Sequence, residues 1–174
     1  MEGTMPSKNV MILDTSILCV WLKVPGKETC GSGRSCIDFT KVDKEIQTAV
    51  QMNYTLVLPL ASIIETGNHI TQAPTWRHER ATDLAGLMSK AADEASPWAA
   101  FSDQQILWSP DGLKSLAAKW PHLAAQKLSI GDATISEVAD YYAQMGFQVE
   151  IYTGDKGLKA HHLITTPPQP RRRR

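Results

Sequence analysis

The sequence lacks the features that mark small secreted proteins and membrane proteins. It has three cysteines in 174 residues, too few and too uneven in number for a disulfide-stapled scaffold. Its longest apolar run, residues 10–22, is interrupted by Asp14 and falls short of the roughly 20 residues that a membrane span needs. No basic segment, apolar core and small-residue cleavage site mark a secretory signal. We therefore expect a soluble, cytoplasmic protein without contact to a membrane.

The formal net charge of the whole chain is zero. Lys plus Arg and Asp plus Glu number 18 each, but four of the basic residues are Arg171–Arg174. Residues 1–170 therefore carry 14 basic against 18 acidic side chains, a net charge of −4. Such a body repels polyanions, so any action on nucleic acid requires metal ions or local basic patches to offset the repulsion.

The cysteines do not indicate a zinc site. Cys30 and Cys36 lie in a Gly- and Ser-rich segment, with no CxxC pair and no histidine nearby. In a cytoplasmic protein we expect them to be reduced thiols.

Composition and length indicate one globular domain. Hydrophobic residues make up 43% of the chain and charged residues 21%, close to the average for soluble proteins. We expect a short polar leader at residues 1–8, a domain over residues 9–167, and a disordered Pro- and Arg-rich tail at residues 168–174.

Apolar runs alternate with amphipathic segments along the domain, which predicts an α/β fold with a mainly parallel sheet. Strands are expected at residues 10–13, 54–58 and 147–152, with shorter ones at 105–108 and 163–166. Helices are expected at residues 17–22, 39–52, 60–71, 74–95, 111–119, 129–145 and 156–160. In the helix over 74–95, the spacing places Ala81, Leu84, Ala85 and Met88 toward the core.

Two acidic residues follow predicted strands. Asp14 comes directly after the apolar run 10–13, and Asp155 follows the strand that ends before Thr153. In an open parallel sheet, ligands bind beyond the carboxyl ends of the strands, where both acids fall. Each has an equally simple structural interpretation, because Asp is a favoured helix N-cap.

Two further acids lie in the first turns of predicted helices. Glu65 follows Ser62 by three residues, and Asp132 follows Ser129 by the same spacing. Both patterns fit a capping box, which is a sufficient structural explanation for either acid alone. Helix N-termini also stabilise ionised carboxylates, and both helices flank the sheet.

The four acids together predict more than each one does. All four map to one edge of the predicted sheet, where they cannot all ionise comfortably without a counter-charge. Mg²⁺ or Mn²⁺ are the natural partners of carboxylate oxygens. Two such ions can hold a phosphodiester during its hydrolysis, which indicates phosphoryl chemistry.

Four segments of the chain resemble, in order, the acidic motifs of the PIN-domain nucleases. They are residues 10–18 with Asp14, 58–65 with Glu65, 131–139 with Asp132, and 151–155 with the Thr-x-Asp spacing of Thr153 and Asp155. The resemblance spans residues 9–167 and implies a three-layer α/β/α fold.

The resemblance also implies an activity and a set of roles. It implies an Mg²⁺- or Mn²⁺-dependent endoribonuclease, often the toxin of a bacterial toxin–antitoxin pair. Asp14, Glu65, Asp132 and Asp155 would be metal ligands, with Thr15 and Thr153 in support. RNA is the implied substrate, and a protein antitoxin, a regulatory partner or a second copy in a homodimer are the implied partners. The segments 23–38 and 73–110 are longer than in compact family members.

Two alternatives remain open. One is a PIN-like RNA-binding module without catalysis, held in a larger assembly. The other is a small-molecule phosphatase with Asp14 as nucleophile, although that chemistry favours a second Asp where this chain has Ser16.

The basic residues outside the motifs have two interpretations each. Arg77 and Arg80 either contact RNA or form a charged helix face with Trp76 packed inward. Arg171–Arg174 either add phosphate contacts or are inert. Glu137 is expected on the helix face away from the acids.

Overall fold

The computed structural model describes residues 8–165, and side chains within residues 8–160. The first seven residues of the leader expected at 1–8, the whole tail expected at 168–174 and the side chains of His161 and His162 therefore lie outside the described part. Arg171–Arg174 lie outside it as well.

A three-stranded parallel sheet forms the centre of the fold. β1 (Asn9–Leu13) lies in the middle, with β4 (Thr55–Val57) on one side and β5 (Gln148–Tyr152) on the other. All three main predicted strands are confirmed, as is the parallel α/β class. Beyond β4, Trp98 makes a single parallel bridge to Leu56 and extends that edge by one residue.

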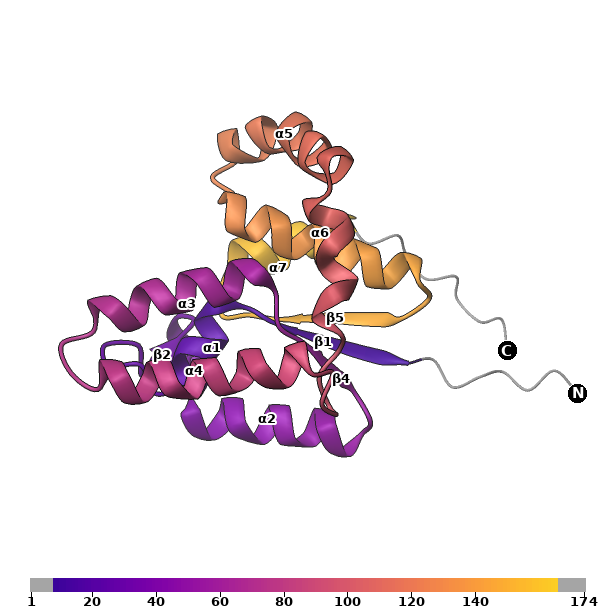
Figure 1. The fold of residues 1–174 in the computed structure, drawn as a ribbon. Coiled ribbons are helices and arrows are strands. Elements are labelled where there is room, and N and C mark those ends of the chain that lie inside the picture. Colours follow the sequence, from indigo (N-terminus) through magenta and orange to yellow (C-terminus); the bar gives the residue numbers. More distant parts are fainter. Residues whose placement is uncertain (1–7, 166–174) are drawn as a thin grey trace, which may run out of the picture.

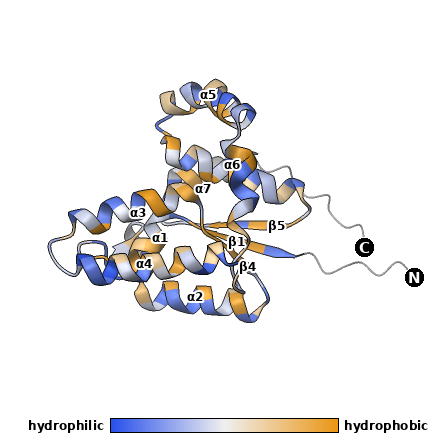
Figure 2. Cartoon of the chain, in the orientation of Figure 1, coloured by the Kyte–Doolittle hydropathy of each residue, from blue (hydrophilic) through white to orange (hydrophobic). Residues whose placement is uncertain are grey.

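Alternation of side chains along β1 divides the core into two parts. Val10 and Ile12 are fully buried against α6 (Ile130–Gln144), and α7 (Lys156–Thr165) adds Leu158 to the same cluster. Met11 and Leu13 face the other way, against α1 (Thr15–Trp21) and α2 (Phe39–Gln51). The sheet is therefore covered by helices on both faces (Figure 1), and apolar residues gather on the central strands (Figure 2). A strand buried on both faces explains the continuous apolar run at its start.

The middle of the chain adds helices around this core. α3 (Leu60–Gln72) packs on α1, and α4 (Arg77–Ala92) packs back on α3. The 3₁₀ helix η2 (Phe101–Trp108) then leads to α5 (Pro110–Ala125), which lies outside α6. The segment 23–38 contains a small antiparallel hairpin of β2 (Thr29–Cys30) and β3 (Ile37–Asp38), joined by η1 (Gly33–Ser35).

Two of the shorter predicted strands are wrong. Residues 105–108 belong to η2, and residues 163–165 continue α7 as a helix. Both predictions relied on short apolar runs, and such runs do not distinguish strand from helix. The helix expected at residues 111–119 is α5, which continues through Pro121 to Ala125.

The predicted inward face of α4 is also largely wrong. Leu84 is buried, but Ala81, Ala85 and Met88 are exposed, and Ala91 is the second buried residue. α4 covers α3 along a narrow stripe, so most of its small and apolar residues stay in contact with water. Within the part of the chain that the structure describes, no helix has the length and hydrophobicity to cross a membrane.

Candidate active site

Asp14 is a buried carboxylate at the end of the central strand. It is 4% exposed, and its backbone N–H donates to the Tyr152 carbonyl at 3.1 Å, which joins the ends of β1 and β5. Its Oδ2 accepts hydrogen bonds from Ser16 Oγ at 2.9 Å and Thr153 Oγ1 at 2.6 Å. The side chain makes no capping bond to α1, although Asp14 occupies the N-cap position. The capping interpretation is therefore wrong for this residue.

Thr153 connects Asp14 to Asp155. While its hydroxyl donates to Asp14, the same oxygen accepts the Asp155 backbone N–H at 2.9 Å. Asp155 is exposed, and its Oδ1 accepts from the N–H groups of Gly157 at 2.7 Å and Leu158 at 3.2 Å. Asp155 is thus a true cap of α7, which leaves its Oδ2 without a bond among those described.

Glu65 reaches the same region from α3. The helix begins at Leu60 with Pro59 as N-cap, so the capping box at Ser62 is wrong and Ser62 is buried within the helix. Glu65 Oε2 instead accepts from Thr15 Oγ1 at 3.0 Å, which ties it to the residue after Asp14. Its Oε1 lies against Gly131, where a Cβ atom would collide with it.

Asp132 completes the set at the start of α6. Ser129 Oγ accepts the Asp132 backbone N–H at 3.0 Å, so the predicted N-cap is confirmed. Burial raises the pKa of the Asp132 carboxyl, the Ser129 hydrogen bond partly opposes that rise, and the negative charges of Asp14, Asp155 and Glu65 each add a smaller increase. Asp14, Asp155 and Glu65 are therefore close enough to Asp132 for their charges to act on its carboxyl group.

These four carboxylates line a single cavity of about 400 Å³. Thr15, Ser16 and Ser129 line it too, together with two residues that sequence reasoning missed, Lys27 and His69. His69 follows Glu65 by four residues and so shares its helix face, a pattern that was available in the sequence. Lys27 lies in the segment before β2, where no local pattern places it near the acids.

The donor set fits a hard divalent cation. Among the described residues, no three or more His, Cys, Asp or Glu side chains converge into a ready metal-binding group. The carboxylates instead line the cavity from four separate segments of the chain. Lys27 is the one Lys or Arg among the described lining residues, so its charge does not balance four acids. Oxygen donors of this kind suit Mg²⁺ or Mn²⁺.

The thiols near the cavity are poorly suited to bind metal. Cys19 and Cys30 line it, and all three cysteines of the chain are free. Burial raises the pKa of Cys19 to about 11 and also raises that of Cys30. Because the thiolate is the metal ligand, these neutral thiols leave the carboxylates as the donors at neutral pH.

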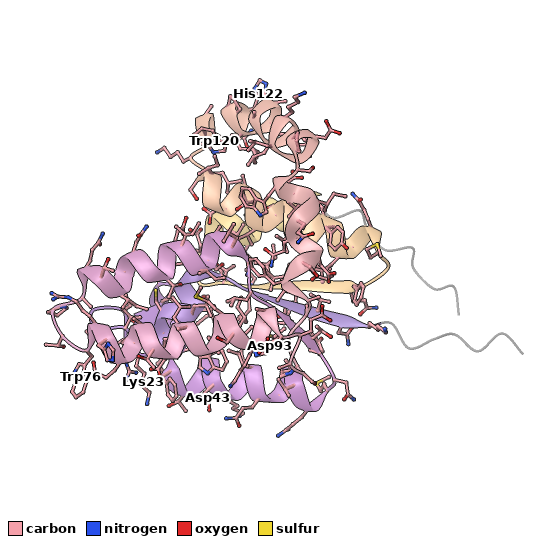
Figure 3. All side chains as sticks on the ribbon, in the orientation of Figure 1. Lys23, Asp43, Trp76, Asp93, Trp120 and His122 are labelled. Carbon is pink, nitrogen blue, oxygen red and sulfur yellow. The ribbon has the colours of Figure 1, made fainter. Side chains whose placement is uncertain are left out.

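Arg77 and Arg80 lie outside this cavity and hold helices in place. Arg77 Nε donates to the Ala73 carbonyl at 2.6 Å, and Arg80 Nη1 donates to the Leu22 carbonyl at 2.9 Å. Arg80 also pairs with Asp83 at 3.4 Å. Trp76 is 62% exposed and projects from the molecule (Figure 3), so the expectation that it packs inward is wrong.

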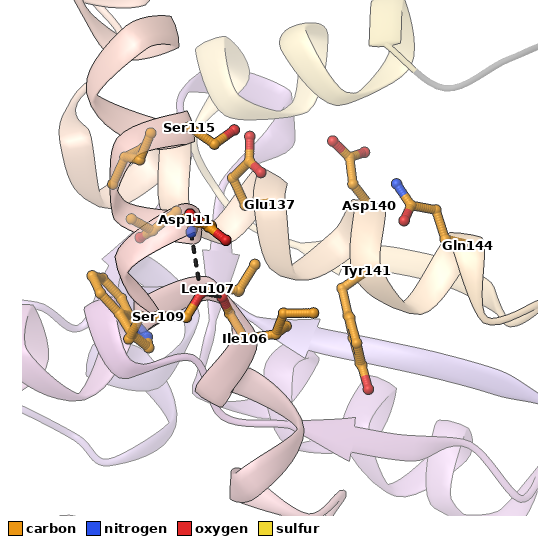
Figure 4. Close-up of a pocket in the computed structure, with 13 residues that line it drawn as sticks. Ile106, Leu107, Ser109, Asp111, Ser115, Glu137, Asp140, Tyr141 and Gln144 are labelled. Carbon is orange, nitrogen blue, oxygen red and sulfur yellow. Dashed lines mark hydrogen bonds between the residues drawn. The ribbon is translucent and has the colours of Figure 1, made fainter.

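Glu137 lies away from the four acids, as predicted. It pairs with Lys119 of α5 at 2.9 Å. It also lines a second cavity of about 330 Å³, where α6 faces Ile106, Ser109 and Asp111 (Figure 4). None of the four carboxylates belongs to this second cavity.

The structural roles of Asp132 and Asp155 predict opposite effects on stability. Folding raises the pKa of Asp132 above its ordinary value of 3.8. The free energy of unfolding therefore falls as the pH rises from 3.8 to the pKa of the folded state. We expect Asp132→Asn to melt higher than wild type at pH 7 in chelator, and this gain to vanish at pH 3. Asp155→Ala should lower the free energy of unfolding by about 1 kcal/mol, because it removes the N-cap of α7. Thermal unfolding of both variants checks this; a lower melting temperature of Asp132→Asn at pH 7 would show that capping dominates there.

Comparison of the chain with models of protein families, with curated proteins and with solved structures gave no match. The chemistry of the cavity and the arrangement of the elements that build it are therefore the grounds for a function.

Proposed function

We propose that the protein is an Mg²⁺- or Mn²⁺-dependent endoribonuclease with a PIN-like fold. One observation supports this most directly: four carboxylates from four separate segments line one cavity at the carboxyl edge of a parallel sheet. These are the segments that resemble the PIN acidic motifs, and they occur in the same order. The helices that cover both faces of the sheet agree with the three-layer fold that the resemblance implies.

Asp14, Glu65, Asp132 and Asp155 would hold the cation. A bound divalent cation supplies positive charge for the phosphodiester oxygens and lowers the pKa of water. The protein's hydroxyl groups orient the ligands: Thr15 holds Glu65, while Ser16 and Thr153 hold Asp14. These bonds fix the carboxylates before the substrate arrives, which reduces the reorganisation needed during reaction.

The negative charge of the cavity also explains why an RNA phosphate needs the cation in order to bind there. An RNA phosphate entering the cavity meets four acids and one lysine. Lys27 contributes a fixed positive charge at the wall, and the bound cation contributes the rest. The same imbalance argues against a binding module without catalysis, since such a module gains nothing from four acids facing the phosphate.

The toxin role and the partner are part of this proposal. A toxin of this class requires an antitoxin, and a small DNA-binding protein encoded by a neighbouring gene would support that role. A homodimer is tested by the molar mass in solution.

Cleavage of single-stranded RNA is the direct test. We expect an end-labelled RNA to be cut internally in Mn²⁺ or Mg²⁺, and cutting to stop in excess EDTA and return when the cation is restored. Products should be resolved by gel, with a phosphatase substrate assayed in parallel. No cleavage of any RNA in either metal, or hydrolysis of the small phosphomonoester alone, would contradict the proposal.

A further inference from the structure

An apolar cleft of about 220 Å³ adjoins the carboxylate cavity. Its walls come from α3, from the end of η2, from α5 and from the first turn of α6. The side chains that line it are almost all apolar: Ala61, Ile64, Trp108, Leu113, Leu116 and Ile130. The described polar lining groups are Glu65 and Thr134, and the Thr134 hydroxyl already donates to the Gly131 carbonyl at 2.7 Å.

The cleft is open to solvent. Ile64 and Leu113 are 54% exposed, Ile130 is 50% exposed and Trp108 is 41% exposed. These four belong to the ten large apolar side chains exposed in the described part of the chain, so surface hydrophobicity is concentrated here. A concave, exposed apolar site with one aromatic ring is typical of a ligand site.

Glu65 forms the wall between the cleft and the carboxylate cavity. Its side chain lines both, and Gly131, against which Glu65 Oε1 lies, lines the cleft. Ile130 points to the cleft, whereas Ser129 and Asp132 on the same helical turn line the cavity. The two spaces share the Glu65 side chain, so a ligand with one group in the cavity reaches the cleft by passing over Glu65.

We propose that this cleft binds an unpaired base of the RNA strand whose phosphodiester occupies the carboxylate cavity. This inference rests on the proposed nuclease function. A nucleobase has a flat apolar face that stacks on an exposed tryptophan, and unpaired bases are available in single-stranded RNA. A stable protein interface uses about 20 to 30 residues on each side, whereas nine residues line this cleft.

The lining also determines what the cleft distinguishes. Its polar side-chain groups are the Glu65 carboxylate, the Trp108 indole N–H and the Thr134 hydroxyl already bonded to Gly131, so the cleft contacts the ring face of a base far more than its hydrogen-bonding edge. We therefore expect the cleft to require a base near the cut phosphodiester but to accept purines and pyrimidines alike, because stacking tolerates every base.

The test compares copies of one short single-stranded RNA in which one residue at a time along the strand is made abasic. Binding is measured by fluorescence anisotropy in Ca²⁺, and single-turnover cleavage in Mn²⁺. For wild-type protein we expect one abasic position to weaken binding by about 10- to 100-fold. Trp108→Ala should lose a similar factor on intact RNA and become insensitive to that abasic position. Trp76→Ala, which alters an exposed tryptophan away from the site, should behave as wild type.

Ile64→Ala serves as a second variant, since this exposed helix residue can be shortened without disturbing the core. It should weaken binding of intact RNA but not of the abasic RNA. Equal binding of intact and abasic RNAs by wild-type protein would overturn the inference even if cleavage is efficient. Absence of cleavage with a clear abasic effect would instead contradict the nuclease proposal alone. Loss of self-association in Trp108→Ala, measured by sedimentation, would assign the cleft to a second copy and overturn the inference.

Discussion

Asp14→Asn is expected to reduce metal-dependent RNA cleavage by on the order of 10³-fold while the protein keeps its fold. Asp14 is buried, and its carboxylate accepts bonds from Ser16 and Thr153. Asparagine has nearly the same shape and retains one acceptor oxygen, so these bonds can persist. What is lost is the negative charge, and with it the means of holding a cation at the end of β1.

The measurement is single-turnover cleavage with Mn²⁺, accompanied by circular dichroism of both proteins. Asp93→Asn is the matched control, because Asp93 is an exposed acid at the end of α4 and lies outside the cavity. It should retain full activity. Mn²⁺ should also raise the melting temperature of wild type and of Asp93→Asn by mass action, but not that of Asp14→Asn. Undiminished cleavage by purified Asp14→Asn would remove Asp14 from the active site.

Gly131→Ala is expected to impair cleavage strongly without unfolding the protein. Alanine normally stabilises a helix relative to glycine by up to about 1 kcal/mol. At Gly131, however, the new methyl group would collide with Glu65 Oε1, the end of a flexible side chain that can swing away. The strain is thereby relieved, but the bond from Thr15 to Glu65 is lost and the carboxylate leaves its position.

We therefore expect a stability within about 1 kcal/mol of wild type and a fall in cleavage rate of about 10- to 100-fold, comparable to the loss of an orienting contact at a metal site. Gly86→Ala is the control, since a Cβ there meets open space on α4. It should gain stability and leave cleavage unchanged. If Gly131→Ala cleaves as fast as wild type, Glu65 has no required position in the reaction.

The parts of this site that follow from the sequence are those encoded by neighbouring residues. An apolar run followed by an acid predicted the buried Asp14, and Ser129 with Asp132 predicted a helix start that the structure confirms. The same kind of spacing at Ser62 failed, because Pro59 starts that helix three residues earlier. A capping pattern is short enough to occur within a helix as well as at its start.

Features that depend on distant residues were not predictable. Lys27 lines the cavity although it lies in the segment before β2, and no local pattern encodes that placement. The apolar run at residues 105–108 was assigned to a strand, yet it forms η2 with Ile106 and Trp108 exposed. Its exposed side chains line the surface of cavities instead of filling a core, which a pattern of hydrophobicity alone does not reveal.

The bond from Thr153 to Asp14 spans 139 residues of sequence, and this separation determines when the site can exist during synthesis. Among the strands of residues 8–165, β5 is the last, yet it pairs with β1, the first. Closing so long a loop carries an entropic cost that is recovered only once the strands pair. A nascent chain that ends before residue 153 has neither the hydroxyl that holds Asp14 nor Asp155 at the cavity rim. The chain must therefore extend 139 residues beyond Asp14 before the hydroxyl that holds this carboxylate exists, so under the proposed function no shorter nascent chain carries the complete site.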